Sequence, residues 1–155
     1  GKMKFIADNM LGKLAKYLRM LGYDTVFPPP GNVRDLIHLS KDENRVILTR
    51  NSIFIRDFKP ENYLFIKSQH FPDQLIQVIK KYGLEINIDK FFTICMICSK
   101  PLLQVSKEEV KEKVPENIYL NFEKFRQCPS CSRIYWRGGH TQRMEKKLMV
   151  IVSSL

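Results

Sequence analysis

Four cysteines, arranged as two matched pairs, are the residues of this chain with the most specific spacing. The pairs are Cys95 with Cys98 and Cys128 with Cys131, each with two residues between its members. This spacing lets one turn present both sulfurs to a tetrahedral ion, and four thiolates leave no open coordination position. We therefore predict one structural Zn²⁺ here. Two redox dithiols or free core cysteines are the alternatives.

A second set of polar side chains could bind an ion that prefers oxygen ligands. Asp8 ends the apolar run 5–7, Asn51 follows the run 45–49, and Asp35 lies in the first turn of a predicted helix. Because parallel strands end at one edge of a sheet, we expect these side chains to converge. Two carboxylates ~4 Å apart repel by about 4 kcal/mol at an effective dielectric of about 20, which favours Mg²⁺ or Mn²⁺ between them. Taken alone, Asp8 also fits a helix N-cap and Asp35 an ordinary first-turn acid.

The elements that must position these residues alternate between strands and helices. Apolar runs predict strands over 5–7, 23–27, 45–49 and 63–66, and amphipathic spacing predicts helices over 10–21, 32–43 and 71–82. Such alternation favours an α/β domain over residues 1–90, with a parallel sheet flanked by helices. Residues 91–155 form a second predicted domain, a zinc ribbon with a basic aromatic tail. We expect Arg19 on an outer helix face, and 148–155 as a packed strand or a disordered segment.

The chain is basic, with 26 Lys and Arg against 16 Asp and Glu and a formal net charge of +10. This balance favours nucleic acid over acidic metabolites as a partner, and a merely soluble basic surface is the alternative. Candidate phosphate-binding residues flank the aromatic pair 135–136 and are Arg133, Arg137 and His140. The aromatic pair either stacks on bases or packs the ribbon. Arg50, beside the acidic edge, is a further candidate for a phosphate contact.

The location of the protein is inferred from the cysteines and the hydropathy. No apolar run approaches the ~20 residues that a membrane span requires. A chain of 155 residues buries an ordinary core without disulfides. We therefore expect a cytoplasmic protein, in a compartment where thiols stay reduced and paired cysteines more often hold metal.

Several motifs together resemble one known family. They are F-I-A-D-N-M-L-G-K-L-A-K-Y-L-R-M-L-G-Y-D at 5–24, R-V-I-L-T-R-N at 45–51, Gln74-Leu75, both cysteine pairs, and Y-W-R-G-G-H at 135–140. In this order they resemble the Mut7-C family, described as a PIN-like ribonuclease domain with a C-terminal zinc ribbon. The resemblance implies a PIN-like α/β fold, RNA as the substrate, single-stranded in our expectation, and a divalent-metal mechanism. By the same resemblance, Asp8 and Asp35 match the family's acidic metal ligands.

One position departs from the family pattern. Where the family usually has Thr-Arg-Asp, this chain has Thr-Arg-Asn, ending at Asn51. An amide oxygen still coordinates a metal but brings no charge, so affinity for the ion should fall. Asp57 compensates only if its loop folds back, and a solvated loop acid is the simpler interpretation.

Three hypotheses follow for the function. The first is a metal-dependent ribonuclease in which Asp8 and Asp35 hold the ion and Asn51 contributes neutral coordination or a water contact. The second is an RNA-binding module whose weakened acidic site does not cut. The third is a subunit that docks onto a larger RNA-processing assembly through its zinc ribbon.

Overall fold

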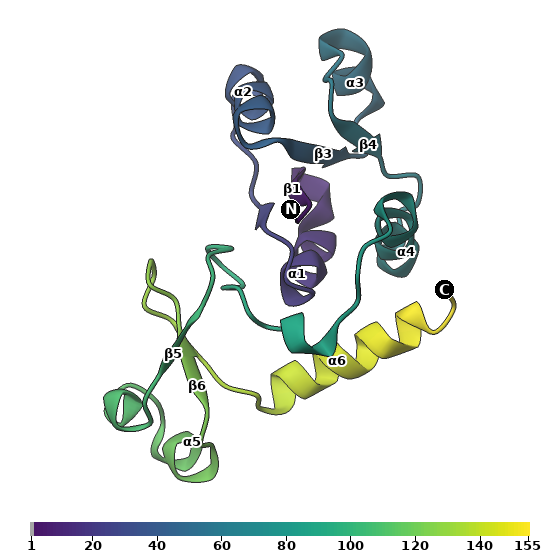
Figure 1. Cartoon of the computed structure of the whole chain (residues 1–155). Helices are drawn as coiled ribbons and strands as arrows, with labels where there is room; N and C mark the ends of the chain where they lie inside the picture. Colours follow the sequence, from purple (N-terminus) through teal and green to yellow (C-terminus); the bar gives the residue numbers. More distant parts are fainter. Residues whose placement is uncertain (1) are drawn as a thin grey trace. The chain divides into compact units, whose positions relative to one another are not determined.

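The computed structural model describes residues 2–155 of the chain, which form two compact units. The first unit ends at Phe92 and the second runs from Thr93 to Leu155. The sequence analysis placed this boundary after residue 90. Figure 1 follows the chain from its purple N-terminus to its yellow C-terminus.

The first unit is built on a four-stranded parallel sheet with the strand order β2-β1-β3-β4. The strands are β1 (Lys4–Ala7), β2 (Thr25–Val26), β3 (Arg45–Thr49) and β4 (Tyr63–Phe65). Strands β1 and β3 lie in the centre and pair along Lys4–Ala7 and Arg45–Leu48. They are buried on both faces of the sheet, which explains their unbroken apolar sequences. The predicted α/β fold with a parallel sheet is confirmed.

Helices cover both faces of this sheet (Figure 1). They are η1 (Asn9–Leu11), α1 (Gly12–Met20), α2 (Val33–Glu43), α3 (Ser52–Phe58), α4 (Phe71–Tyr82) and η2 (Ile88–Lys90). Ile6 and Ile47 form one core cluster with apolar residues of α2 and α3. Phe5, which alternates to the opposite face, places its ring 6.0 Å from that of Tyr82 in α4. Each central strand therefore supplies side chains to two apolar layers.

Most helices and strands match the predictions, and three differ from them. The expected helix at 10–21 starts as the 3₁₀ turn η1 before α1 begins. The strand expected over 23–27 is shortened to two residues. Helix α3 was not predicted, because its seven residues are too few to show a helical period.

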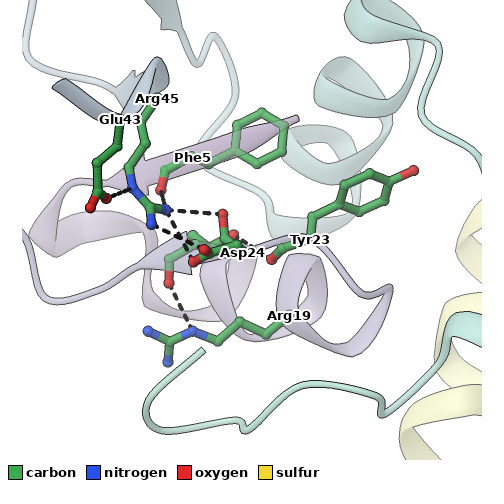
Figure 2. Close-up of polar contacts among 7 residues, drawn as sticks. Phe5, Arg19, Tyr23, Asp24, Glu43 and Arg45 are labelled. Atoms are coloured by element: carbon green, nitrogen blue, oxygen red, sulfur yellow. Dashed lines mark hydrogen bonds and ion pairs between the residues drawn. The ribbon is translucent and has the colours of Figure 1, made fainter. Parts of the chain in front are cut away.

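Two buried arginines donate hydrogen bonds to main-chain oxygens of β1 and β2 (Figure 2). Arg45 donates to the main-chain oxygen of Phe5 and to both carboxylate oxygens of Asp24, and it also pairs with Glu43 at 2.6 Å. Arg19 is only 6% exposed and donates from Nε to the oxygen of Thr25 at 2.9 Å. The prediction that Arg19 lies on an outer face is therefore wrong, because strand-end carbonyls replace water around its guanidinium.

The outer edge of β4 is covered by one side chain of α4. Gln77 donates from Nε2 to the main-chain oxygen of Phe65 at 2.8 Å and accepts the N–H of Lys67 at 3.0 Å. Phe65 and Tyr63 are 36% and 40% exposed on this edge strand. The Gln77 amide thus pairs with main-chain groups that a further strand would otherwise bind.

The second unit contains a three-stranded antiparallel sheet in the order β5-β6-β7. Its elements are β5 (Leu103–Val105), η3 (Glu108–Val110), α5 (Glu116–Asn121), β6 (Phe125–Gln127), β7 (Ile134–Tyr135) and α6 (Gly139–Val152). Ser106 and Glu109 form a capping box, each accepting the other's main-chain N–H at 3.3 Å.

The C-terminal segment differs from its prediction. Helix α6 continues to Val152, so residues 148–152 are neither a strand nor disordered. Its buried residues are Thr141, Met144, Leu148 and Ile151, which recur at helical spacing. The period starts before residue 148, so the segment from 148 onward was too short to show it. Among the described residues, no helix is long and apolar enough to cross a membrane.

Candidate functional site

The parallel sheet changes its winding direction between β1 and β3. From β1 the chain passes outward to β2, and from β3 it passes in the other direction to β4. At such a switch point the carboxyl ends of two neighbouring strands separate into a crevice where ligands commonly bind. Asp8 directly follows β1, and Arg50 directly follows β3. We call these strand ends and the residues beside them the β1/β3 edge.

The carboxylate of Asp8 spans this edge. Its Oδ2 accepts the main-chain N–H of Arg50 at 2.9 Å, and its Oδ1 accepts that of Met10 at 3.0 Å. Its own N–H donates to the oxygen of Leu48 at 3.0 Å and so continues the pairing of β1 with β3. Asp8 is half-buried and caps η1, so the N-cap interpretation holds for one of its oxygens. An ionised carboxylate offers about four lone-pair sites, so both oxygens can still accept a cation.

Arg50 and Asn51 are both fixed by their neighbours. The guanidinium of Arg50 donates from a terminal nitrogen to the oxygen of Ile66, just beyond β4, at 2.8 Å. Asn51 is the N-cap of α3, with its Oδ1 accepting the N–H of Phe54 at 3.0 Å. The sequence analysis assigned Asn51 to metal coordination and missed this capping role. The signal was present, because asparagine before a short apolar run is a preferred helix start.

Asp35 differs from Asp8 in having no partner. It lies in the first turn of α2, behind the N-cap Asn32, and its side chain is exposed. No hydrogen bond or ion pair joins its carboxylate to any residue that the structure describes. Asp57 lies in α3 and pairs with Arg56 at 2.9 Å, so it is a helix residue and not the loop acid expected. The structure thus joins Asp8 to Arg50 by a hydrogen bond and, among the residues it describes, shows none from the Asp35 carboxylate to either.

The four cysteines form the other candidate site. Their sulfurs all lie within 4.8 Å of one another, and Cys95 Sγ is 3.7 Å from Cys131 Sγ. Four sulfurs at about 2.3 Å from a tetrahedral Zn²⁺ are about 3.8 Å apart, so the spacing fits that ion. Among residues 2–155, this is the one group of three or more His, Cys, Asp or Glu side chains placed to share a metal ion.

The two cysteine turns have the same local structure. In each, the sulfur of the first cysteine accepts the main-chain N–H groups two and three residues later. The distances are 3.4 and 3.3 Å at Cys95, and 3.4 and 3.5 Å at Cys128. The residue after the second cysteine has a positive φ, 60° at Ser99 and 64° at Ser132. The next carbonyl, of Lys100 or Arg133, accepts the N–H of the first cysteine at 2.8 or 2.9 Å. Two copies of one turn therefore present the four sulfurs.

Tyr135 supports one of the four sulfurs from β7. Its hydroxyl lies 3.0 Å from Cys95 Sγ and accepts the main-chain N–H of Met96 at 3.0 Å. Burial, and then the hydrogen bond to Cys95, raise the pKa of Tyr135, so the phenol stays protonated and donates to the sulfur. Burial alone raises the pKa of Cys95, but hydrogen bonds from Tyr135 and from main-chain N–H groups lower it to about 7. The arrangement favours a thiolate, which is the form that binds metal.

The remaining predicted residues lie in the second unit. Arg133 follows the second cysteine turn and is exposed. Arg137 pairs with Glu145 of α6 at 2.8 Å, and His140 is exposed in the first turn of α6. Trp136 packs its ring 6.4 Å from that of Phe125, so it is a ribbon residue with a packing role.

The chain was compared with curated proteins and with models of protein families. No curated protein matches the chain significantly. A family model described as the Mut7-C RNAse domain matches residues 3–148, which include the β1/β3 edge and both cysteine turns. That description indicates a ribonuclease-type function. Because the match covers nearly the whole chain, this protein belongs to the Mut7-C RNAse domain family.

Proposed function

We propose that this protein is a divalent-metal-dependent ribonuclease whose active site is the β1/β3 edge. The observation that carries the proposal is the carboxylate of Asp8, fixed at the switch point of the sheet by the main chain of Arg50. Family membership supports RNA as the substrate, and the net charge of +10 favours a polyanion. A single-stranded substrate and a cytoplasmic location are parts of the same proposal.

Asp8 and Asp35 are the residues that would hold Mg²⁺ or Mn²⁺. Hard divalent ions often bind through one or two carboxylates and keep several waters, so two acids suffice. Asn51 would add a neutral oxygen or a water contact. When bound, such an ion lowers the pKa of a coordinated water and offsets the negative charge of the phosphate. The four cysteines hold a separate, structural Zn²⁺, because a site of four thiolates has no open position.

Arg50 is proposed to position the scissile phosphate. Its hydrogen bond to Ile66 fixes the guanidinium next to the end of β4 and occupies one of five N–H donors. The remaining donors have the planar arrangement that pairs with two phosphate oxygens. In this arrangement, Asp8 attracts the divalent metal ion and Arg50 attracts the phosphate of the RNA. Each charged side chain at the edge therefore has a partner of opposite charge.

Cleavage of single-stranded RNA by zinc-loaded protein, with added Mn²⁺ or Mg²⁺, tests this function. We expect Asp35→Ala to abolish cleavage without changing the melting temperature, because the Asp35 carboxylate has no partner. The matched control is Asp42→Ala, which removes an exposed acid from the other end of the same helix, α2. Cleavage that is equal in the wild type and in Asp35→Ala would refute the assignment of this residue and indicate a contaminating nuclease.

A second candidate function is RNA binding without cleavage. The observation in its favour is Asn51, whose side chain carries no charge and whose Oδ1 already accepts the N–H of Phe54. An edge with two carboxylates and this amide attracts a divalent ion less strongly than one with three carboxylates. This candidate would be favoured if the wild type binds RNA but does not cleave it at any Mn²⁺ concentration, and if Asn51→Asp makes the protein cleave.

A further inference from the structure

An open groove of about 450 Å³ lies within the second unit, beside the second cysteine turn. Its lining comes from the β6–β7 hairpin and from the segment before α5, and consists of Lys113, Val114, Pro115, Gln127, Ser132, Arg133, Ile134 and Trp136. The volume falls within the range of roughly 300–1,000 Å³ in which proteins bind small molecules. The groove is therefore large enough for one unit of a polymer.

The charged residues that line the groove favour an anion as its ligand. Two of the lining residues, Lys113 and Arg133, are cations, and none is acidic. Neither cation forms an ion pair with any residue that the structure describes, whereas Arg137 pairs with Glu145 in the same unit. A bound anion would therefore meet two positive charges without displacing a protein carboxylate.

The apolar lining of the groove includes Trp136, held in place by its neighbours. The ring packs near Phe125 of β6. A Cβ at Gly138 would lie 3.0 Å from the Nε1 of Trp136, so the absence of a side chain there makes room for the indole. Proline and isoleucine contribute the other apolar surface. A flat aromatic ring beside two cations matches a base attached to a phosphate.

The second cysteine turn positions one of the cations. The carbonyl of Arg133 accepts the N–H of Cys128 at 2.9 Å, and the N–H of Ser132 donates to the carbonyl of Cys128 at 2.9 Å. Gln127 donates from its side chain to the carbonyl of Ser132 at 2.9 Å, which ties the turn to β6. The wall of the groove that carries Arg133 is thus part of the turn that presents two of the sulfurs.

We infer that this groove binds a nucleotide of single-stranded RNA, with the base against Trp136 and the phosphates at Lys113 and Arg133. The class of partner rests on the proposed function, while the geometry of the groove does not. The groove belongs to the second unit and the β1/β3 edge to the first, so the protein would bind RNA through both units. An acidic peptide satisfies the two cations equally well, but it gives the indole no flat partner.

The test uses the fluorescence of Trp136, the single tryptophan of the chain. The full-length, zinc-loaded protein is titrated, without added Mg²⁺ or Mn²⁺, with a single-stranded RNA of about 12 nucleotides. We expect saturable quenching by the RNA. Charge reversal by Arg133→Glu should weaken binding by about tenfold or more, since it removes one phosphate contact and adds a repulsion.

A matched control comes from the duplicated cysteine turn. Lys100 occupies in the first turn the position that Arg133 occupies in the second, is exposed, and does not line the groove. Lys100→Glu changes the net charge by the same amount and should leave binding within about twofold, by the small size of screened, distant charge effects. With Lys113→Ala and Arg133→Ala combined, the slope of log K against log salt should fall by about 1.4, at about 0.7 for each lost phosphate contact.

The outcomes separate this inference from the proposed function. Cleavage of RNA without quenching of Trp136, or equal losses with Lys100→Glu and Arg133→Glu, would overturn the groove assignment and leave the nuclease proposal standing. If quenching is lost only in the groove variants and the protein does not cleave RNA, the groove assignment stands and the nuclease proposal is overturned. Poly-glutamate that quenches Trp136 and competes with RNA at matched charge would assign the groove to an acidic peptide instead.

Discussion

The two candidate metal sites are assembled in opposite ways. The cysteine site takes its four ligands from two copies of one short turn, and each turn is closed by hydrogen bonds within six residues of sequence. The metal site proposed at the β1/β3 edge takes Asp8 and Asn51 from the ends of strands that are neighbours only because of the sheet order, and would take Asp35 from a helix. Local spacing determines the first site, and topology determines the second.

This difference predicts how strongly each site is coupled to folding. Both cysteine turns are built around the metal, and without it their four sulfurs lose the ion that offsets the repulsion between thiolates. At the β1/β3 edge, the side chains of Asp8 and Asn51 also bond the main chain, whereas the Asp35 carboxylate bonds none of the residues that the structure describes. We therefore expect stability and activity to change together at the cysteine site and to separate residue by residue at the edge.

The largest effect should come from removing a zinc ligand. Cys128→Ser should lose the metal and unfold the second unit, since zinc contributes about 10–16 kcal/mol to the folding of small zinc domains. The zinc content measured by elemental analysis should fall below one ion per chain. The fluorescence emission of Trp136 should shift towards that of a solvated indole. Ser130→Ala, in the same turn, is the control and should keep the metal. A folded second unit in metal-free Cys128→Ser would break the comparison.

The next effect should separate the two acids. Asp8→Ala leaves the N–H groups of Arg50 and Met10 without their acceptor, so we expect it to destabilise the first unit by about 1–3 kcal/mol. Asp35→Ala should change stability by less than about 1 kcal/mol. Both should abolish cleavage. Urea unfolding curves measured beside the cleavage assay check this, and equal destabilisation by the two changes would contradict it.

A smaller effect is expected at the support of the cysteine site. Tyr135→Phe removes the hydroxyl that meets Cys95 Sγ and accepts the N–H of Met96. Loss of such an outer hydrogen bond typically lowers metal affinity by about 10–100-fold. Competition with a chromophoric zinc chelator measures this change. Tyr119→Phe is the control, because Tyr119 lies in the same unit and its hydroxyl has no hydrogen-bond partner in the described structure. Unchanged affinity in Tyr135→Phe would limit its role to packing.

The last prediction concerns Asn51, at which one substitution should change stability and another should change metal affinity. Asn51→Ala should cost about 0.5–2 kcal/mol through the lost cap of α3. Asn51→Asp should keep the cap and add a charge, so Mn²⁺ should bind more tightly and cleavage should rise. Isothermal titration with Mn²⁺ and urea unfolding measure the two properties. Weaker Mn²⁺ binding by Asn51→Asp would place the metal elsewhere.

The sequence predicts those parts of the molecule that depend on short-range patterns. The cysteine spacing, the apolar strands β1 and β3, and the amphipathic helices α2 and α4 each show their pattern within a short stretch of sequence. The burial of Arg19 was missed because its acceptors belong to another element, β2 and the residue after it. The cap at Asn51 was missed because the same side chain also fitted a metal site. Whether Asp35 and Asp8 share an ion stays a prediction, since it depends on side-chain positions that no local pattern determines.

The side chain of Gln77 has a consequence for the behaviour of the protein at high concentration. Strand β4 is an open edge that carries two partly exposed aromatic residues, a composition that favours growth of a sheet from molecule to molecule. Because the amide of Gln77 mimics a neighbouring strand at Phe65 and Lys67, an incoming chain has to displace it before it can add to the sheet. One uncharged side chain thus protects the edge against self-association.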